Sequence, residues 1–178
     1  MAYQKLQVSD GLAVILSDTV PIPDPTTAIV LDATTTGATV GNADFSVAGT
    51  LTDARTKFTD AGIKKGDIIY NTTAGSAGQA YTVVSVDSDT QLTITPSLAG
   101  GGTDNYSIYS DATIGCILYV GTAGNLAVEM AARNGNMANP PANSKLTFSN
   151  LPNASFMPTQ VVKVRDTGTT ASNIIALW

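Results

Sequence analysis

The hydrophobic pattern of this chain is typical of many short β-strands. Apolar and β-branched residues form brief runs, several of which alternate with polar residues, and Gly, Pro, Asn, Asp and Ser separate the runs. Such alternation predicts strands with one buried face. Strands are predicted at residues 29–31, 44–47, 67–71, 80–86, 91–95, 106–109, 114–120, 126–130, 146–148, 160–165 and 174–178. The pattern therefore predicts an all-β fold in which helix is the minority state.

Two parts of this pattern predict particular arrangements of strands. Residues 80–86 and 91–95 are separated by a short turn of Asp and Ser residues, which predicts a β-hairpin. Residues 114–120 form an uninterrupted apolar run, so this strand is expected in a sheet that is covered on both faces. After a turn that contains two glycines, residues 126–130 are expected to form its hairpin partner.

Three prolines interrupt the pattern near the start of the chain. Pro21, Pro23 and Pro25 stand at alternate positions, where each lacks a backbone N–H donor and biases the preceding residue towards extended geometry. They predict an extended arm or linker and a domain boundary.

We expect two small β modules, each a sandwich or a barrel, with one inserted into the other. The split module comprises residues 1–27 and 111–178, and the inserted module comprises residues 28–110. A chain of 178 residues is long enough for two such modules, each with its own modest core.

The composition argues against several classes of function. Only 13% of the residues are charged, and the net charge of -5 leaves no basic stripe with which to bind nucleic acid. No apolar stretch reaches the length of a membrane span, and the amino terminus lacks the pattern of a secretory signal, so we expect synthesis in the host cytoplasm. The single cysteine, Cys116, lies in an apolar run and is interpreted as a buried thiol.

Chemistry-bearing motifs are scarce. The chain has no histidine, which excludes Ser-His-Asp and Cys-His catalysis and most zinc sites. Asp53 could pair with Asp60 and Asp67, and Asp87 with Asp89, around a sugar or a calcium ion. Each of these residues adjoins turn-forming residues, so we interpret them as turn caps. No catalytic, cofactor-binding or metal-ligating residue is predicted, and no cofactor is expected.

Five short segments of the expected split module carry a resemblance, at residues 118–126, 146–148, 156–158, 161–164 and 167–177. They resemble the head spike-base family of tailed phages and phage-derived gene transfer agents, and the resemblance covers about residues 1–27 and 111–178. Residues 58–62, 66–67, 71–73 and 84–93 resemble a small β module that recurs in phage structural proteins. The whole chain is similar to virion proteins of marine cyanobacterial tailed phages.

The resemblance implies a non-enzymatic virion structural protein. We expect a capsid decoration (cement) protein or a head spike base that binds the capsid exterior and stabilises it or supports fibres. The implied partners are further copies of the chain in a trimer or pentamer, the major capsid protein and a fibre protein, with no nucleic acid and no membrane. A tail, neck or baseplate component and a carbohydrate-binding host-adhesion module stay open as alternatives, and an enzyme is the least favoured class.

Assembly contacts are expected in the proline arm, in the Asn-rich stretch at residues 134–143 and in the apolar tail. The candidate contact residues are Pro21, Pro23, Pro25, Asn136, Pro140, Pro141, Ile174, Ile175, Leu177 and Trp178. Each segment also has a simpler interpretation, as a linker, a loop or a core strand.

Overall fold

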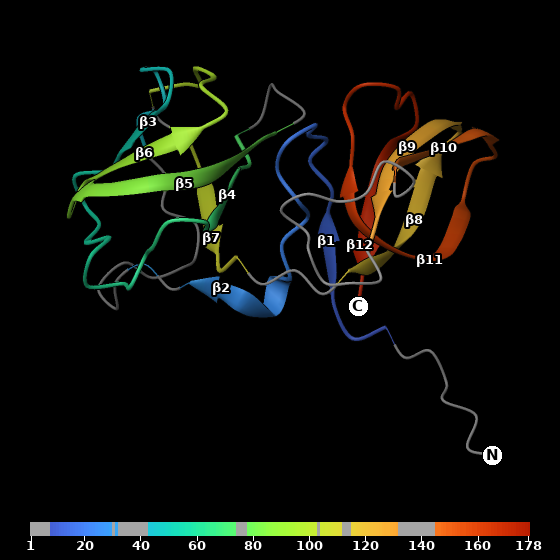
Figure 1. Ribbon diagram of the computed structural model, residues 1–178, viewed down its shortest axis with the longest axis horizontal. Helices are drawn as coiled ribbons and strands as arrows, with labels where there is room; N and C mark the ends of the chain where they lie inside the picture. Colours follow the sequence, from blue (N-terminus) through green and yellow to red (C-terminus); the bar gives the residue numbers. More distant parts are fainter. Residues whose placement is uncertain are drawn as a thin grey trace, which may run out of the picture. The chain divides into compact units, whose positions relative to one another are not determined.

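The computed structural model describes residues 8–29, 31, 43–73, 78–102, 104–111, 115–131 and 145–178. The all-β prediction is confirmed, because these residues form two six-stranded antiparallel sheets (Figure 1). The strands are β1 (Gly11–Ala13), β2 (Ala28–Ile29), β3 (Thr50–Thr52), β4 (Ile68–Asn71), β5 (Gln79–Ser88), β6 (Gln91–Thr95), β7 (Tyr106–Tyr109), β8 (Cys116–Thr122), β9 (Gly124–Met130), β10 (Lys145–Leu151), β11 (Ser155–Val164) and β12 (Ser172–Leu177). The only helix in the described ranges is the short 3-10 helix η1 (Pro25–Thr27).

The chain divides into two compact units, each built around one sheet. The split unit comprises Met1–Val14 and Ile114–Trp178, and the continuous unit comprises Ile15–Thr113. In this division residues 15–27 belong to the continuous unit. Whether either unit folds by itself stays a prediction.

The continuous unit holds the predicted hairpin. Its strand order is β2-β7-β4-β5-β6-β3. Strands β5 and β6 pair across the predicted turn, and register shifts near Val83 and Val86 mark β-bulges. The sheet packs on an aromatic core in which the Phe45 ring lies 5.4 Å from the Tyr81 ring and 6.0 Å from the Tyr106 ring. This core explains why the short strands hold together: a few large rings bury much apolar area.

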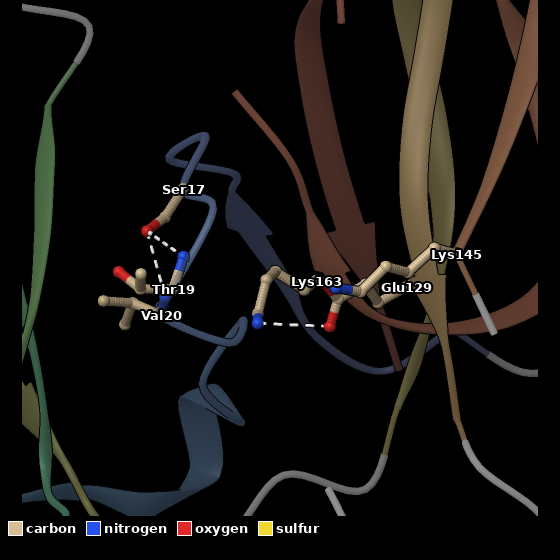
Figure 2. Close-up of polar contacts among 6 residues, drawn as sticks. All are labelled: Ser17, Thr19, Val20, Glu129, Lys145 and Lys163. Carbon is tan, nitrogen blue, oxygen red and sulfur yellow. Dashed lines mark hydrogen bonds and ion pairs between the residues drawn. The ribbon is translucent and has the colours of Figure 1, made fainter. Parts of the chain in front are cut away.

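The segment with the three prolines is ordered by local hydrogen bonds. Ser17 Oγ accepts hydrogen bonds from the backbone N–H groups of Thr19 and Val20, at 3.3 and 3.0 Å (Figure 2). Asp24 caps η1, since its Oδ1 accepts from the Thr26 N–H at 2.9 Å. Val20 and Ile22 are buried. The segment therefore bends at Asp18 and Thr19 and continues to η1 with its apolar side chains buried, rather than forming a fully extended arm.

The split unit has the strand order β1-β12-β8-β11-β9-β10. Strand β11 changes partner along its length. Its first residues, Ser155 to Met157, pair with β8, and Lys163 and Val164 pair with β9, with register shifts between the two halves. A strand that changes partner through such bulges turns a corner, so the sheet can fold over its own apolar face.

The expected hairpin of residues 114–120 and 126–130 is wrong. Strands β8 and β9 follow one another in the chain, but β11 lies between them in the sheet. The connection turns sharply at Gly124, where an added Cβ would lie 2.7 Å from the carbonyl carbon of Thr170. The glycines of this turn were predicted correctly. The turn, however, connects β8 to β9, which β11 separates in the sheet, and does not close a hairpin.

Strand β8 also departs from the sequence-based expectation of cover on both faces. Cys116, Leu118 and Val120 are buried, whereas Ile117 and Tyr119 between them are only half-buried. One face of the strand therefore packs on the core of the split unit. The other face is apolar without being fully covered by this chain.

Candidate assembly surface

The described aromatic residues of the split unit lie at its surface. Tyr119, Phe148 and Trp178 are half-buried, and Phe156 is 63% exposed. The described aromatics of the continuous unit, in contrast, are all buried; they are Phe45, Phe58, Tyr70, Tyr81, Tyr106 and Tyr109. Aromatic side chains are enriched at protein interfaces, so this unequal placement directs attention to the split unit.

An apolar row crosses four neighbouring strands of the split unit. Register pairs Ala13 with Ile175, Ile175 with Tyr119, and Tyr119 with Phe156. Residues that face each other across antiparallel strands project to the same side of the sheet, so we name these four residues the outer row. The Tyr119 and Phe156 rings lie 5.2 Å apart, and Ile175 is 39% exposed.

A second line of apolar residues lies beside the outer row. Leu177 pairs with Ile117, two positions along from Ile175 and Tyr119, and both are half-buried. Strands β8, β12 and β1 and the paired start of β11 contain no Lys, Arg, Asp or Glu. A surface that is apolar, aromatic and free of charge has the composition of the buried centre of a protein interface.

The predicted tail residues divide between this surface and the core. Ile175 and Leu177 lie on the outer side, whereas Ile174 is buried on the opposite side of β12. Trp178 is half-buried, and its backbone is tied to the start of β1: its N–H donates to Asp10 O at 3.1 Å, and its O accepts from Ser9 N–H at 2.7 Å. The tail is thus a core strand with one exposed side.

The other predicted contact residues are less accessible or fall outside the described residues. Pro23 is buried, and Pro21 and Pro25 are half-buried. Asn136, Pro140 and Pro141 lie outside the described residues. The structure therefore brings Ile175 and Leu177 onto one surface and places the three prolines elsewhere, in the continuous unit.

Sequence reasoning missed Tyr119 and Phe156. The signal for Tyr119 was present in the uninterrupted apolar run of β8, which implied cover on both faces. The structure supplies that cover on one face only. For Phe156, which precedes Met157 and Pro158, no periodicity distinguished it from a core residue.

At the far side of the same sheet, a buried carboxylate lies between two lysines (Figure 2). Glu129 on β9 faces Lys145 on β10 and Lys163 on β11 in register. Its Oε2 lies 3.2 Å from Lys163 Nζ, and its Oε1 lies 3.8 Å from Lys145 Nζ. The pair with Lys163, which is 13% exposed, is little screened by water, whereas the longer pair with Lys145 on β10, which is 49% exposed, is screened more strongly.

The titratable residues singled out in the sequence serve local structure. Burial raises the pKa of the Cys116 thiol to about 12, and its Sγ donates to Val161 O at 3.3 Å, which confirms the interpretation of a buried thiol. Hydrogen bonds from Thr93 and Ser85 lower the pKa of Asp87, so this carboxylate fastens the β5–β6 hairpin. Burial raises the pKa of Asp67, whose Oδ2 accepts from Lys64 N–H at 2.9 Å.

Within the described ranges, no group of three or more His, Cys, Asp or Glu residues could hold a metal ion. No helix in those ranges is long and apolar enough to cross a membrane. Comparisons with known proteins gave no match, whether to a protein-family model, to a curated protein or to a solved structure.

Proposed function

We propose that this chain is a non-enzymatic structural protein of a tailed-phage virion, a capsid decoration protein or head spike base that acts by assembly. Two lines of reasoning support the proposal. The resemblance of its sequence segments to the spike-base family suggests the particle. The outer row of the split unit suggests how the chain would attach.

The observation that carries the proposal is the exposed, uncharged apolar surface of the split unit. Covering apolar area stabilises an assembly by roughly 25 cal/mol per Å² before the costs of association are subtracted. Phe156, at 63% exposed, and Tyr119 beside it are the natural centre of such a contact. A chain that does not assemble would leave this surface in water.

Symmetry would multiply a modest contact. A partner that binds only the folded, assembled form shifts the equilibrium between free and assembled chains towards assembly by mass action. Each added copy contributes a further contact. We therefore assign to the split unit the contacts with further copies in a trimer or pentamer and with the major capsid protein. The described aromatic residues of the continuous unit are buried, so we assign no attachment contact to this unit. It would support a fibre or only add mass to the particle.

A carbohydrate-binding host-adhesion module is the second candidate, and the Tyr119–Phe156 ring pair favours it, because exposed rings can stack on sugars. Ligand sites for small molecules combine such rings with a few convergent polar groups. Here the cross-strand neighbour of Tyr119 on its other side is Ile175, which in turn pairs with Ala13, and neither side chain can donate a hydrogen bond. The apolar surroundings therefore favour a protein partner.

A cryo-electron-microscopy map of the particle that contains this chain tests the proposal. We expect density on the head, as trimers on the capsid faces or pentamers at the vertices, with the outer row facing protein. Density on the tail would contradict a decoration role and support a tail, neck or baseplate component. Absence from the particle, together with binding of host glycans, would support the adhesion module.

A further inference from the structure

Strand β10 is an open edge of the split unit. It stands last in the strand order and, among the described residues, pairs with β9 alone. Five of its seven residues are exposed, and the other two are half-buried, so neither of its faces is fully covered. An edge strand of this kind offers its backbone as a template for another strand.

The register indicates which backbone groups of β10 point away from β9 and have no partner among the described residues. On β9, the Ala127 C=O accepts from Arg165 N–H at 2.8 Å, on the side of β11. Backbone groups alternate in direction along a strand, so Val128 and Leu126 direct theirs towards β10, where they face Leu146 and Phe148. Lys145 and Thr147, which alternate with these two, point their N–H and C=O groups away from β9. Ser149 follows at the start of the bulge, where the register with β9 is interrupted.

These free groups are arranged symmetrically about Thr147. The regular part of β10 ends at a bulge, where Asn150 has a φ of 56°. A second copy that runs antiparallel about a two-fold axis at Thr147 would place Thr147 opposite Thr147 and Lys145 opposite Ser149. The N–H and C=O groups of the two Thr147 residues then meet in the ladder geometry, and those of Lys145 meet Ser149 at the start of the bulge.

The side chains agree with this register. The lone charged residue of β10, Lys145, is already ion-paired with Glu129. The two copies of Lys145 would stand four residues apart along the ladder, about 13 Å, which exceeds the Debye length at physiological salt. A two-fold axis at Lys145 would instead set like charges opposite each other, which is unfavourable.

The apolar side chains of β10 would also face apolar side chains of the second copy. Leu146 is 45% exposed and lies on the same side as Phe148, next to the buried Val128 and Leu126. In the antiparallel pair, Leu146 of each copy would lie opposite Phe148 of the other, an aliphatic–aromatic pair of the kind that stabilises sheets. The core of one copy would thereby continue into the core of the next.

We propose that β10 pairs with β10 of a second copy of this chain, about a two-fold axis at Thr147, and joins the two split-unit sheets into one continuous sheet. This contact deepens the proposed assembly function and rests on it. It uses a different surface from the outer row. An isologous contact of this kind closes on itself, so alone it gives a dimer, and together with the outer row it links larger assemblies.

Cysteine cross-linking of the full chain tests the register. In Thr147→Cys the two thiols would sit on residues whose Cα atoms lie about 5.5 Å apart, within the reach of a disulfide. In Ser149→Cys the equivalent residues would be about 13 Å apart, beyond that reach. We expect mild oxidation to give a covalent dimer of Thr147→Cys but not of Ser149→Cys, nor of the unmodified chain, whose Cys116 is buried. No dimer of Thr147→Cys, or equal dimer from both variants, would overturn the proposal.

Light scattering of two lysine variants tests the contact without a cross-link. Thr147→Lys sets two positive charges on the two-fold axis, and we expect it to be monomeric where the unmodified chain is dimeric. Thr52→Lys adds the same charge to an exposed threonine of the edge strand β3 and should leave the dimer intact. A monomeric unmodified chain, or a dimer that survives Thr147→Lys, would overturn the proposal. A chain that is monomeric yet decorates particles would refute the β10 contact alone, whereas a dimer absent from particles would refute the virion function alone.

Discussion

The two units of this chain place their described aromatic residues in opposite ways. In the continuous unit every described aromatic ring is buried, and rings stack on one another, as Phe45 does on Tyr81. In the split unit the core is aliphatic, and the described rings lie at the surface. Both units expose some aliphatic side chains, Val47 and Leu98 in the continuous unit among them, but among the described residues only the split unit has aromatic rings at its surface.

The edges of the two sheets differ in the same sense. The continuous unit ends in β2 and β3, which are two and three residues long, and the backbone of Asp44 pairs with Thr52 on β3. Short or covered edges discourage pairing with other chains. The split unit ends in the short β1 and in β10, which has seven residues. The placement of the rings and the length of the β10 edge are the reasons why we propose that the split unit makes the assembly contacts.

The largest expected effect comes from exchanging one ring in each unit. Phe45→Ala should lower the free energy of unfolding of the continuous unit by about 3–5 kcal/mol, because it empties the centre of a packed aromatic cluster. Phe156→Ala should lower the stability by less than about 1 kcal/mol, since its ring is mostly exposed. It should nevertheless abolish incorporation into particles. Urea denaturation followed by circular dichroism gives both stabilities, and equal losses would mean that Phe156 serves the fold rather than a contact.

The next effect concerns the buried carboxylate that holds β10. Glu129→Gln should cost about 2–3 kcal/mol, because it leaves the Lys163 ammonium, 13% exposed, without its partner. Asp60→Asn removes the exposed Lys57–Asp60 pair of the continuous unit and should change stability by less than about 0.5 kcal/mol. Thermal unfolding of both variants checks the difference. A cost for Asp60→Asn as large as that for Glu129→Gln would show that burial does not set the strength of these pairs.

A smaller effect depends on pH and lies in the continuous unit. Asp67 is fully buried, its Oδ1 has no hydrogen-bond partner among the described residues, and burial raises its pKa. A raised folded pKa means that the folded chain binds the proton more tightly than the unfolded chain, so stability falls as the pH rises from 3.8 through the folded pKa. Asp67→Asn removes this charge, and we expect it to be more stable than the unmodified chain at pH 7, by about 1 kcal/mol, but not at pH 3. Denaturant midpoints at the two pH values test the sign, and an equal change at both would contradict it.

The sequence predicted the local elements better than their neighbours in space. Alternation identified the β5–β6 hairpin because both strands and their turn are contiguous in the chain. The sheet position of β11 depends on a change of partner near Pro158, which no local pattern expresses. For that reason β9 was wrongly expected to pair with β8.

The candidate surface was predicted only in part, and for a related reason. Ile175 and Leu177 were singled out because the apolar tail was conspicuous, but Ile174 beside them belongs to the core. Which residues of an apolar strand face outward depends on the register that joins β12 to β8 and β1. Tyr119 and Phe156, from strands distant in the sequence, meet through the register that pairs β11 with β8.

The smallest expected effect concerns Cys116, because the labelling rate of its thiol reports on opening of the split unit alone. Its thiol is buried in β8 with a pKa of about 12, so an alkylating reagent at pH 8 should label it only when the split unit opens. If the two units unfold independently, Phe45→Ala should leave the labelling rate of Cys116 unchanged, although it destabilises the continuous unit. If they unfold as one, a loss of about 3–5 kcal/mol would be transmitted and would speed labelling by about a hundredfold or more. We expect the unchanged rate, because the residues that surround Phe45 all lie in the continuous unit.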